Sequence, residues 1–390
     1  MRTKHMKCLA GVTAVTATVL GFSAGPTAAS GHHEHVVRPG ESIQKAVDAA
    51  RPGDTVVVLP GTYRESVLIT TPGLTLRGTG ERTVIAPQAP ATAEAPATAG
   101  TTETAGTAPA KTASGPAAAK GPRAANACAA GGNGICVVGT AANPVDGVRI
   151  RALTVSGFAK TGVWASWTDG LSVRRVTARD NGTWGIAQER STRADLRHNT
   201  ATGNGDAGIF VANSVSEEGG ATDTDGTVVA DNSVSGNRIG VTARRVRNLR
   251  IDDNTVTGNC SGIFVVGDES KPAAGAMTIS GNRIVKNNKL CAATPRLSAI
   301  QGSGIVLTGS ESTVVRSNVI QDNVGTTDFS GGILLFKSFV GAVNTDNTVQ
   351  DNLVSGNSPA DLANRDTSGT GNTFTGNTCA TSEPAGMCAA

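Results

Sequence analysis

The sequence predicts an all-β protein, a right-handed parallel β-helix solenoid with a short amino-terminal capping helix. Two repeated features predict it. The first is a strand that opens with Gly and Ile or Val and recurs with a basic step of 22 or 23 residues. The second is a pair of Asn residues five positions apart, found seven times. A period of this size indicates stacked coils, and 49 Gly with a single Tyr in 390 residues agree with many tight turns.

The Gly strands follow one another in steps of 23, 23, 32, 22, 42 and 28 residues, and the longer steps contain polar insertions such as residues 214–226. In each strand the second residue is expected to point inward, and the third and fifth outward. The strands begin at Gly162, Gly185, Gly208, Gly240, Gly262, Gly304 and Gly332.

The Asn pairs are expected to stand at corners, because Gly or Asp usually precedes them and both types tolerate a positive φ. In stacked coils the side-chain amide of each Asn could hydrogen-bond to the Asn of the next coil. All seven pairs are expected to occupy the same two corners of their coils. A leucine-rich repeat shares the period but would show a Leu ladder. The pairs are Asn199/Asn204, Asn232/Asn237, Asn254/Asn259, Asn282/Asn287, Asn318/Asn323, Asn352/Asn357 and Asn372/Asn377.

The chain begins like an exported protein. Residues 1–29 combine a basic start, an apolar run and small residues before Ala29, which is typical of a signal peptide, and a flexible His-rich stretch follows at 30–35. Removing Arg2, Lys4 and Lys7 lowers the formal charge from +3 to 0. We therefore expect a secreted monomer with no membrane span, no affinity for nucleic acid and no attraction to an anionic membrane.

Residues 36–390 are expected to form one β-helix domain. Ser42 can cap a short helix with an apolar face of Ile43, Ala46, Val47 and Ala50, and strand runs follow at residues 55–60, 66–69, 74–78 and 83–86. Residues 86–127 are nearly all Ala, Thr, Pro and Gly, so they are expected to form a flexible loop inserted into this domain.

Six cysteines remain after the signal peptide, and an even number in an exported chain favours disulfides. The simplest of 15 connectivities joins neighbours, Cys128 with Cys136, Cys260 with Cys291 and Cys379 with Cys388. Zinc is the weaker interpretation because the chain has no CxxC pair.

The stretch VRPGESIQKAVDAARPGDTVVVLPGTYRESV and the GNxxSGIFV-like coils resemble the pectin-lyase-like superfamily. The resemblance is closest to parallel β-helix repeat proteins of the NosD and carbohydrate-binding or sugar-hydrolase type, and it covers most of residues 36–378. It implies an exported protein that acts on carbohydrate. It leaves the reaction open, because the superfamily contains lyases, hydrolases, epimerases and adhesins.

The catalytic motifs of two branches are missing. The NTD and DD motifs of galacturonidase-like hydrolases occur in reversed order, at residues 344–346 and 252–253, without GHG, and the DPHD motif of mannuronan epimerases is absent. A lyase stays open, since it needs a calcium ion held by carboxylates and an Arg or Lys to take the C5 proton.

Outward positions of the Gly strands supply the candidate site. Trp164, Trp184, Phe210 and Phe264 could stack on sugar rings, or loops could cover them. The candidate catalytic residues are Glu189, Arg190, Asp206 and Arg244. Residues 149–197 contain nine Lys or Arg against four Asp or Glu, an excess of five positive charges that could hold an acidic polysaccharide, although solvated flanks also carry Arg.

Two metal hypotheses remain. Arg175, His198, Asp231 and Asp253 form a column before the Asn positions, which indicates either a metal or acid/base cluster or, more simply, corner residues. His32 in a new amino terminus Ser30-Gly31-His32 could hold Cu²⁺ or Ni²⁺, and a disordered polar start is the alternative.

Two functions therefore remain open. The first is a pectate-lyase-like enzyme that cleaves a uronate-containing glycan by β-elimination, with calcium as its expected cofactor. The second is a non-catalytic β-helix that binds a glycan or another surface, with the amino-terminal copper site as an addition.

Overall fold

A computed structural model describes residues 32–88, 126–295 and 297–388. The expected signal peptide and most of the expected 86–127 loop lie outside these ranges. Within them, no helix is long and apolar enough to cross a membrane.

The Gly strands form a parallel sheet of eleven strands in the described part of the chain, with one strand per coil. We call it the front sheet. Its strands are β4 (Val67–Ile69), β7 (Ile135–Val138), β10 (Val163–Ser166), β13 (Ile186–Glu189), β16 (Ala207–Ala212), β19 (Ile239–Arg244), β22 (Ser261–Val266), β26 (Ser303–Thr308), β30 (Gly331–Phe336), β33 (Leu362–Arg365) and β35 (Ser382–Glu383).

The remaining faces of the coils form a 22-stranded parallel sheet, again counted over the described residues, which we call the back sheet. Its first strands are β1 (Glu34–Val37), β2 (Thr55–Val58), β3 (Gly61–Arg64), β5 (Thr75–Arg77), β6 (Thr83–Ala86), β9 (Arg149–Ser156), β12 (Ser172–Arg179), β14 (Asp195–Arg197), β15 (Thr200–Thr202), β17 (Thr222–Ala230) and β18 (Ser233–Ser235).

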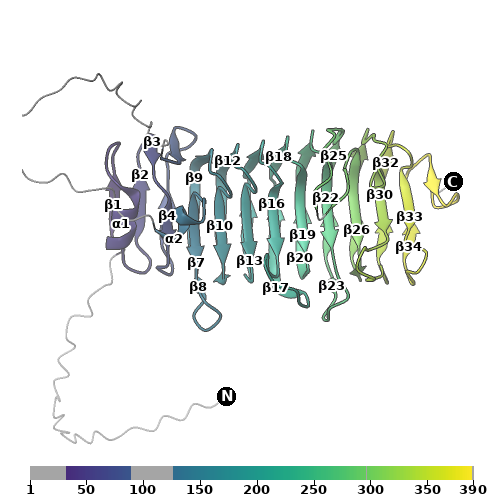
Figure 1. Cartoon of the computed structure of the whole chain (residues 1–390), viewed down its shortest axis with the longest axis horizontal. Helices are drawn as coiled ribbons and strands as arrows, with labels where there is room; N and C mark the ends of the chain where they lie inside the picture. Colours follow the sequence, from purple (N-terminus) through teal and green to yellow (C-terminus); the bar gives the residue numbers. More distant parts are fainter. Residues whose placement is uncertain (1–31, 89–125, 296, 389–390) are drawn as a thin grey trace, which may run out of the picture. The chain divides into compact units, whose positions relative to one another are not determined.

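The other back-sheet strands are β20 (Val246–Asp252), β21 (Thr255–Thr257), β23 (Ala274–Gly275), β24 (Thr278–Ser280), β25 (Arg283–Val285), β27 (Ser310–Glu311), β28 (Val314–Arg316), β29 (Val319–Gln321), β31 (Thr348–Gln350), β32 (Leu353–Ser355) and β34 (Thr373–Thr375). A small pair, β8 (Val145–Asp146) and β11 (Thr168–Asp169), stands beside them. Figure 1 shows the coils side by side in sequence order, so the predicted parallel β-helix is confirmed.

The alternation predicted for the Gly strands is also confirmed. In β22, Ile263 and Val265 pack in the interior core, whereas Phe264 packs in a separate outer cluster. The short corner-to-corner strands each point one apolar side chain inward, as at Val234 and Val256, both with 0% exposure. The interior is thus a column of aliphatic side chains.

Two Asn ladders run through the corners, as predicted. The Nδ2 of one Asn donates to the Oδ1 of the Asn in the next coil at 2.8–3.1 Å, for example from Asn204 to Asn237 and from Asn237 to Asn259. Asn357 ends its ladder by donating to Asp361. The expectation that all pairs occupy the same two corners is wrong for the last pair. Asn377 continues the first ladder after Asn352, while Asn372 pairs with Asn347 at a different corner.

The column before the Asn positions consists of corner residues. Arg175, His198, Asp231 and Asp253 all have φ between 53° and 56°, which short polar residues tolerate better than β-branched ones. The corner interpretation therefore accounts for their positions.

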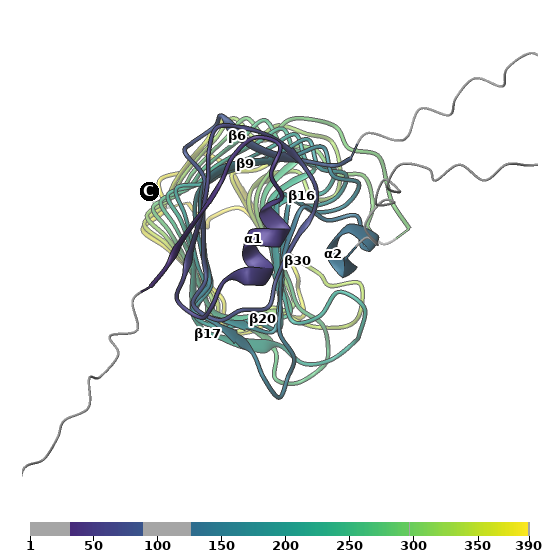
Figure 2. The same cartoon turned by 90° about the vertical axis from the view of Figure 1, so that its left-hand side faces the viewer.

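Helix α1 (Ile43–Ala49) closes the amino-terminal end of the solenoid (Figure 2). The hydroxyl of Ser42 accepts the backbone N–H of Lys45 at 3.2 Å, which is the predicted N-cap. Ile43 and Val47 are buried against the first coils. A second short helix, α2 (Ala127–Ala130), lies outside the front sheet and contacts β4.

The three predicted disulfides are confirmed among the described cysteines. Cys128–Cys136 fixes α2 to β7, and Cys379–Cys388 lies at the carboxyl end. Cys260–Cys291 fixes the insertion before β26 to the coil of β22.

Candidate functional site

The outward third position of the front-sheet strands is largely covered. Phe264 is 2% exposed and packs edge-on against Phe329, with ring centroids 5.3 Å apart, and Phe210 is 5% exposed. Neither ring has a free face for a sugar, so these two residues follow the alternative that the sequence left open, cover by other parts of the chain. The cover comes from residues distant in sequence, because Phe329 and Ile300 belong to later coils.

The least covered part of this column is an aromatic stack of Trp164, Trp184 and Phe210. The rings of Trp164 and Trp184 are 5.9 Å apart and 17° from parallel, and those of Trp184 and Phe210 are 4.5 Å apart and 13° from parallel. Both Trp side chains are half-buried. Trp184 is stacked on both of the other rings, so Trp164 is the member of the stack that suits contact with the apolar face of a sugar.

Asp206 is attached to this stack. Its Oδ2 accepts the indole N–H of Trp184 at 3.0 Å, and its backbone oxygen accepts the N–H of Arg238 at 3.0 Å. Burial raises the pKa of the Asp206 carboxyl, while the hydrogen bond from Trp184 and the charge of Arg238 lower it less strongly. A carboxyl with a raised pKa beside a half-open aromatic surface is a candidate acid/base group.

Arg238 connects Asp206 to the insertion before β26. Its guanidinium donates to the backbone oxygens of Ala292 at 2.6 Å and Ser298 at 3.3 Å. The Cys260–Cys291 disulfide holds the same insertion. This cation was not predicted from the sequence, since only the fold places it next to Asp206.

Glu189 and Arg190 hold a loop on the front sheet. Glu189 accepts the hydroxyl of Ser166 at 3.1 Å and the backbone N–H of Val215 at 2.8 Å. Arg190 donates to the hydroxyl of Ser214 at 3.1 Å, pairs with Glu217, and lies 5.2 Å from the ring centre of Trp167. Both side chains thus hold the loop of residues 213–218 against the front sheet in this structure.

Arg244 reaches the same loop, with its Nη1 3.5 Å from the backbone oxygens of Ser214 and Val215. The adjacent Arg245 pairs with Glu218 and with the buried Asp268. We call Glu189, Arg190, Arg244 and Arg245, which hold this loop, the charged clamp. A cavity of about 520 Å³ lies beside it, lined in part by Trp167, Asp169 and Arg190.

The four candidate catalytic residues do not converge. Glu189 ends β13 and aligns with Ala212, while Asp206 precedes β16. Six residues of strand separate these levels, or about 20 Å at 3.3 Å per residue. The structure therefore divides the four residues between two places: Asp206 lies at the start of the strands, and Glu189, Arg190 and Arg244 lie at their end.

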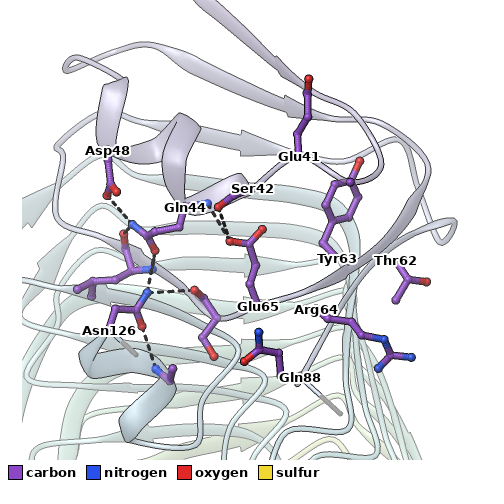
Figure 3. Close-up of a pocket in the computed structure, with 14 residues that line it drawn as sticks. Glu41, Ser42, Gln44, Asp48, Thr62, Tyr63, Arg64, Glu65, Gln88 and Asn126 are labelled. Atoms are coloured by element: carbon purple, nitrogen blue, oxygen red, sulfur yellow. Dashed lines mark hydrogen bonds between the residues drawn. The ribbon is translucent and has the colours of Figure 1, made fainter. Parts of the chain in front are cut away.

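A second cavity of about 530 Å³ lies beside α1 (Figure 3). Its polar side chains bind one another. Glu65 accepts the backbone N–H of Ile43 at 2.7 Å and the hydroxyl of Ser42 at 2.8 Å, and the amide oxygen of Gln44 accepts the amide of Asn126 at 2.9 Å. These contacts cap α1 and hold Asn126, which gives the cavity wall a structural role.

The described residues contain no group of three or more His, Cys, Asp or Glu side chains placed to hold a metal ion. The carboxylates of Glu189 and Glu217 near the front sheet are engaged by hydrogen bonds and ion pairs, and the expected calcium ion stays a prediction. Ser30 and Gly31 of the expected copper site lie outside the described ranges. His33 and His35 instead contact Asp54.

A family model described as "Protein of unknown function (DUF1565)" matches residues 24–249, more than half of the chain. The chain belongs to the DUF1565 family. A second model, "Right handed beta helix region", matches residues 220–386 of this DUF1565 member and confirms the resemblance to pectin-lyase-like β-helix proteins. No curated protein matches it.

Solved structures share the fold of this DUF1565 chain at low identity. The periplasmic alginate epimerase AlgG is 14% identical with a TM-score of 0.54, and the match covers 89% of this chain and 73% of that one. DFA-IIIase from Arthrobacter chlorophenolicus A6 is 13% identical with a TM-score of 0.53 and 90% coverage of both chains. The A-module of the Azotobacter vinelandii mannuronan C-5 epimerase AlgE6 is 18% identical, covering 87% of this chain and 90% of that one, with a TM-score of 0.49.

Proposed function

We propose that this protein is exported and acts on a uronate-containing polysaccharide at the Asp206 site. The observation that carries the proposal is the Asp206 carboxyl, whose pKa is raised by burial and which is bonded to an indole of a half-open aromatic stack. The structural similarity to an alginate epimerase and to DFA-IIIase supports a carbohydrate as the ligand.

The proposed reaction is β-elimination. The Asp206 carboxylate takes the C5 proton of a uronate, the C4–O bond breaks as the C4=C5 double bond forms, and the carboxylic acid returns the proton to the departing oxygen. A raised pKa suits a group that both accepts and donates a proton. Arg238 supplies the positive charge that offsets the uronate carboxylate, and the Trp164 ring positions the sugar.

The decisive experiment compares the wild-type protein with Asp206→Asn on polygalacturonate, alginate and chondroitin, following the unsaturated uronate product. We expect Asp206→Asn to lower the rate by at least about 100-fold, the usual contribution of a general acid or base. Asp322→Asn is the matched control, because Asp322 is an exposed corner residue with φ 56° that Asn also tolerates.

Trp184→Phe tests the role of Asp206 by its pH dependence. This variant keeps an aromatic ring in the stack but removes the N–H donor that lowers the Asp206 pKa. The rate of an enzyme that uses the Asp206 carboxylate should then fall at a higher pH than in the wild type as the solution is acidified. An unchanged pH profile would argue against Asp206.

The alternative is a glycan-binding scaffold without catalysis. The engagement of Glu189 and Arg190 in loop contacts favours it, since neither is free to act on a substrate in this structure. No unsaturated product from any of the three glycans, together with binding that Trp164→Ala weakens, would establish this alternative.

A further inference from the structure

Four arginines lie in register on the outer surface of the back sheet. Arg77 of β5 is paired with Arg151 of β9, Arg151 with Arg174 of β12, and Arg174 with Arg197 of β14. These strands belong to successive coils, which lie about 4.8 Å apart. We call this column the arginine ladder; it spans about 14 Å along the solenoid axis.

The ladder is directed to solvent. Arg77, Arg151 and Arg174 are exposed, and Arg197 is half-buried. The residue directly before each of them points into the core; these residues are Leu76, Ile150, Val173 and Leu196. The exposed Arg149 and Arg175 flank it.

Most of this charge is not neutralised by described residues. Arg174 and Arg197 share Asp195, and Arg197 also reaches Asp231 at 3.3 Å. The side chains of Arg77, Arg149, Arg151 and Arg175 make no hydrogen bond or ion pair with any described residue. Six arginines thus face two aspartates, Asp195 and Asp231, an excess of four positive charges.

Like charges directly opposite one another destabilise a sheet, and the rest of the column avoids them. Beyond Arg197 the same position holds Ala230, Asp252, Ser280, Arg316, Gln350 and Thr375. Arg316 is the single arginine among these six, flanked by Ser280 and Gln350. Repulsion between stacked arginines is relieved when an anion with a matching charge spacing lies across them.

We propose that the arginine ladder binds an acidic polysaccharide along the solenoid axis. An extended polyuronate carries one carboxylate per sugar ring, and the length of a ring along the chain is close to the coil spacing, so successive carboxylates can meet successive guanidinium groups. Arg suits this contact because its fork binds a carboxylate through two hydrogen bonds. Duplex DNA does not match, because its phosphates rise about 3.4 Å per nucleotide along the helix axis and wind around that axis, so they form no straight row at the coil spacing.

The ladder rests on the proposed function for one point, that the partner is a uronate-containing glycan, and adds a second surface that binds it. It also places that contact on the back sheet, away from Asp206 on the front sheet. The surface would hold a polymer while the front sheet engages another part of it, which raises the effective concentration of the substrate.

The test measures binding of the full-length protein to polygalacturonate, to neutral dextran and to duplex DNA at low and physiological salt. Arg77→Gln/Arg151→Gln removes two arginines that have no described partner. Arg283→Gln/Arg316→Gln is the matched control, because both residues are exposed strand arginines in distant coils and also lack described ion pairs. Circular dichroism melting verifies that each variant is folded.

We expect Arg77→Gln/Arg151→Gln to weaken polygalacturonate binding about tenfold, as for the loss of two charge-assisted contacts, and the control pair to change it less than twofold. Equal losses of polygalacturonate binding in both double variants would mean that only overall charge matters. DNA binding as strong as polygalacturonate binding would mean unspecific ion exchange. Either result, or no polygalacturonate binding by the wild type, overturns the proposal. Asp206→Asn should bind like the wild type, so loss of activity with retained ladder binding separates the two proposals.

Discussion

Asn237 and Gln188 are both buried amides, but only one of them is satisfied. Asn237 has 0% exposure, and its side chain bonds to Asn204, Asn259 and the backbone oxygen of Ala201. Gln188 is 1% exposed on the inner face of β13, between Ala165 and Val211, and neither its amide nitrogen nor its oxygen has a partner. Asn237 stands at a corner, where the next coils supply Asn partners, whereas Gln188 stands on the inner face of a strand among apolar side chains.

Replacing Gln188 with Leu should stabilise the protein. The substitution keeps a side chain of similar size and removes two buried polar atoms without partners, a gain of about 1–3 kcal/mol in the free energy of unfolding. Urea unfolding followed by circular dichroism measures it. Asn237→Leu is the opposite control and should lower the unfolding midpoint, because it leaves ladder partners unbonded; a midpoint that falls for Gln188→Leu as well would mean that Gln188 has a partner.

Among the elements, the first strands depend on Asp54. Its carboxylate accepts the backbone N–H of Arg51 at 2.9 Å and of His33 at 2.8 Å and meets the His35 ring at 3.1 Å. These contacts, led by the N–H of Arg51, hold the pKa of Asp54 well below its usual range. The carboxylate thereby ties β1 to the turn before β2.

The lowered pKa gives this contact a defined pH dependence. The folded state holds the ionised form of Asp54, so its stabilisation is fully present above the pKa of an unfolded aspartate, near 4, and is lost progressively as the pH falls below that value. Asp54→Asn should therefore lower the melting temperature at neutral pH, and the difference from the wild type should shrink in acid. Melting curves between about pH 7 and pH 2.5 measure it, and a difference independent of pH would contradict the role of the charge.

At the level of the whole molecule, stability is distributed along a stack in which each coil contacts its neighbours. Two of the disulfides close loops of different lengths at different places in it. Cys260–Cys291 spans 31 residues in the middle of the stack, and Cys379–Cys388 spans 9 at its end.

Removing the central disulfide should therefore cost more than removing the terminal one. The loop entropy of the unfolded chain predicts losses of about 4 kcal/mol for Cys260→Ser/Cys291→Ser and about 2.5 kcal/mol for Cys379→Ser/Cys388→Ser. The central variant should also loosen the cover over Phe264 and increase binding of a hydrophobic dye. Equal melting temperatures of the two variants would show that position and loop length do not matter here.

The coil period, the inward and outward alternation, the Asn ladders, the helix cap and the disulfides could all be predicted from the sequence. Each depends on contacts that repeat at a fixed step, so the spacing of residues such as Asn232 and Asn237 carries the information. The last pair shows where this stops, because Asn372 and Asn377 keep the five-residue spacing but stand one corner earlier, opposite Asn347 and Asn352.

Only the tertiary structure decided which outward residues are free. Phe264 is covered by Phe329 from another coil, and Arg238 meets Asp206 from the next coil. No spacing within one strand encodes these contacts. The arginine ladder was visible in the sequence only as a local excess of charge, because the insertion between Arg77 and Arg151 hides their register. Repeats determine the stack, but insertions of irregular length determine what covers its faces, and their conformation depends on contacts far away in the chain.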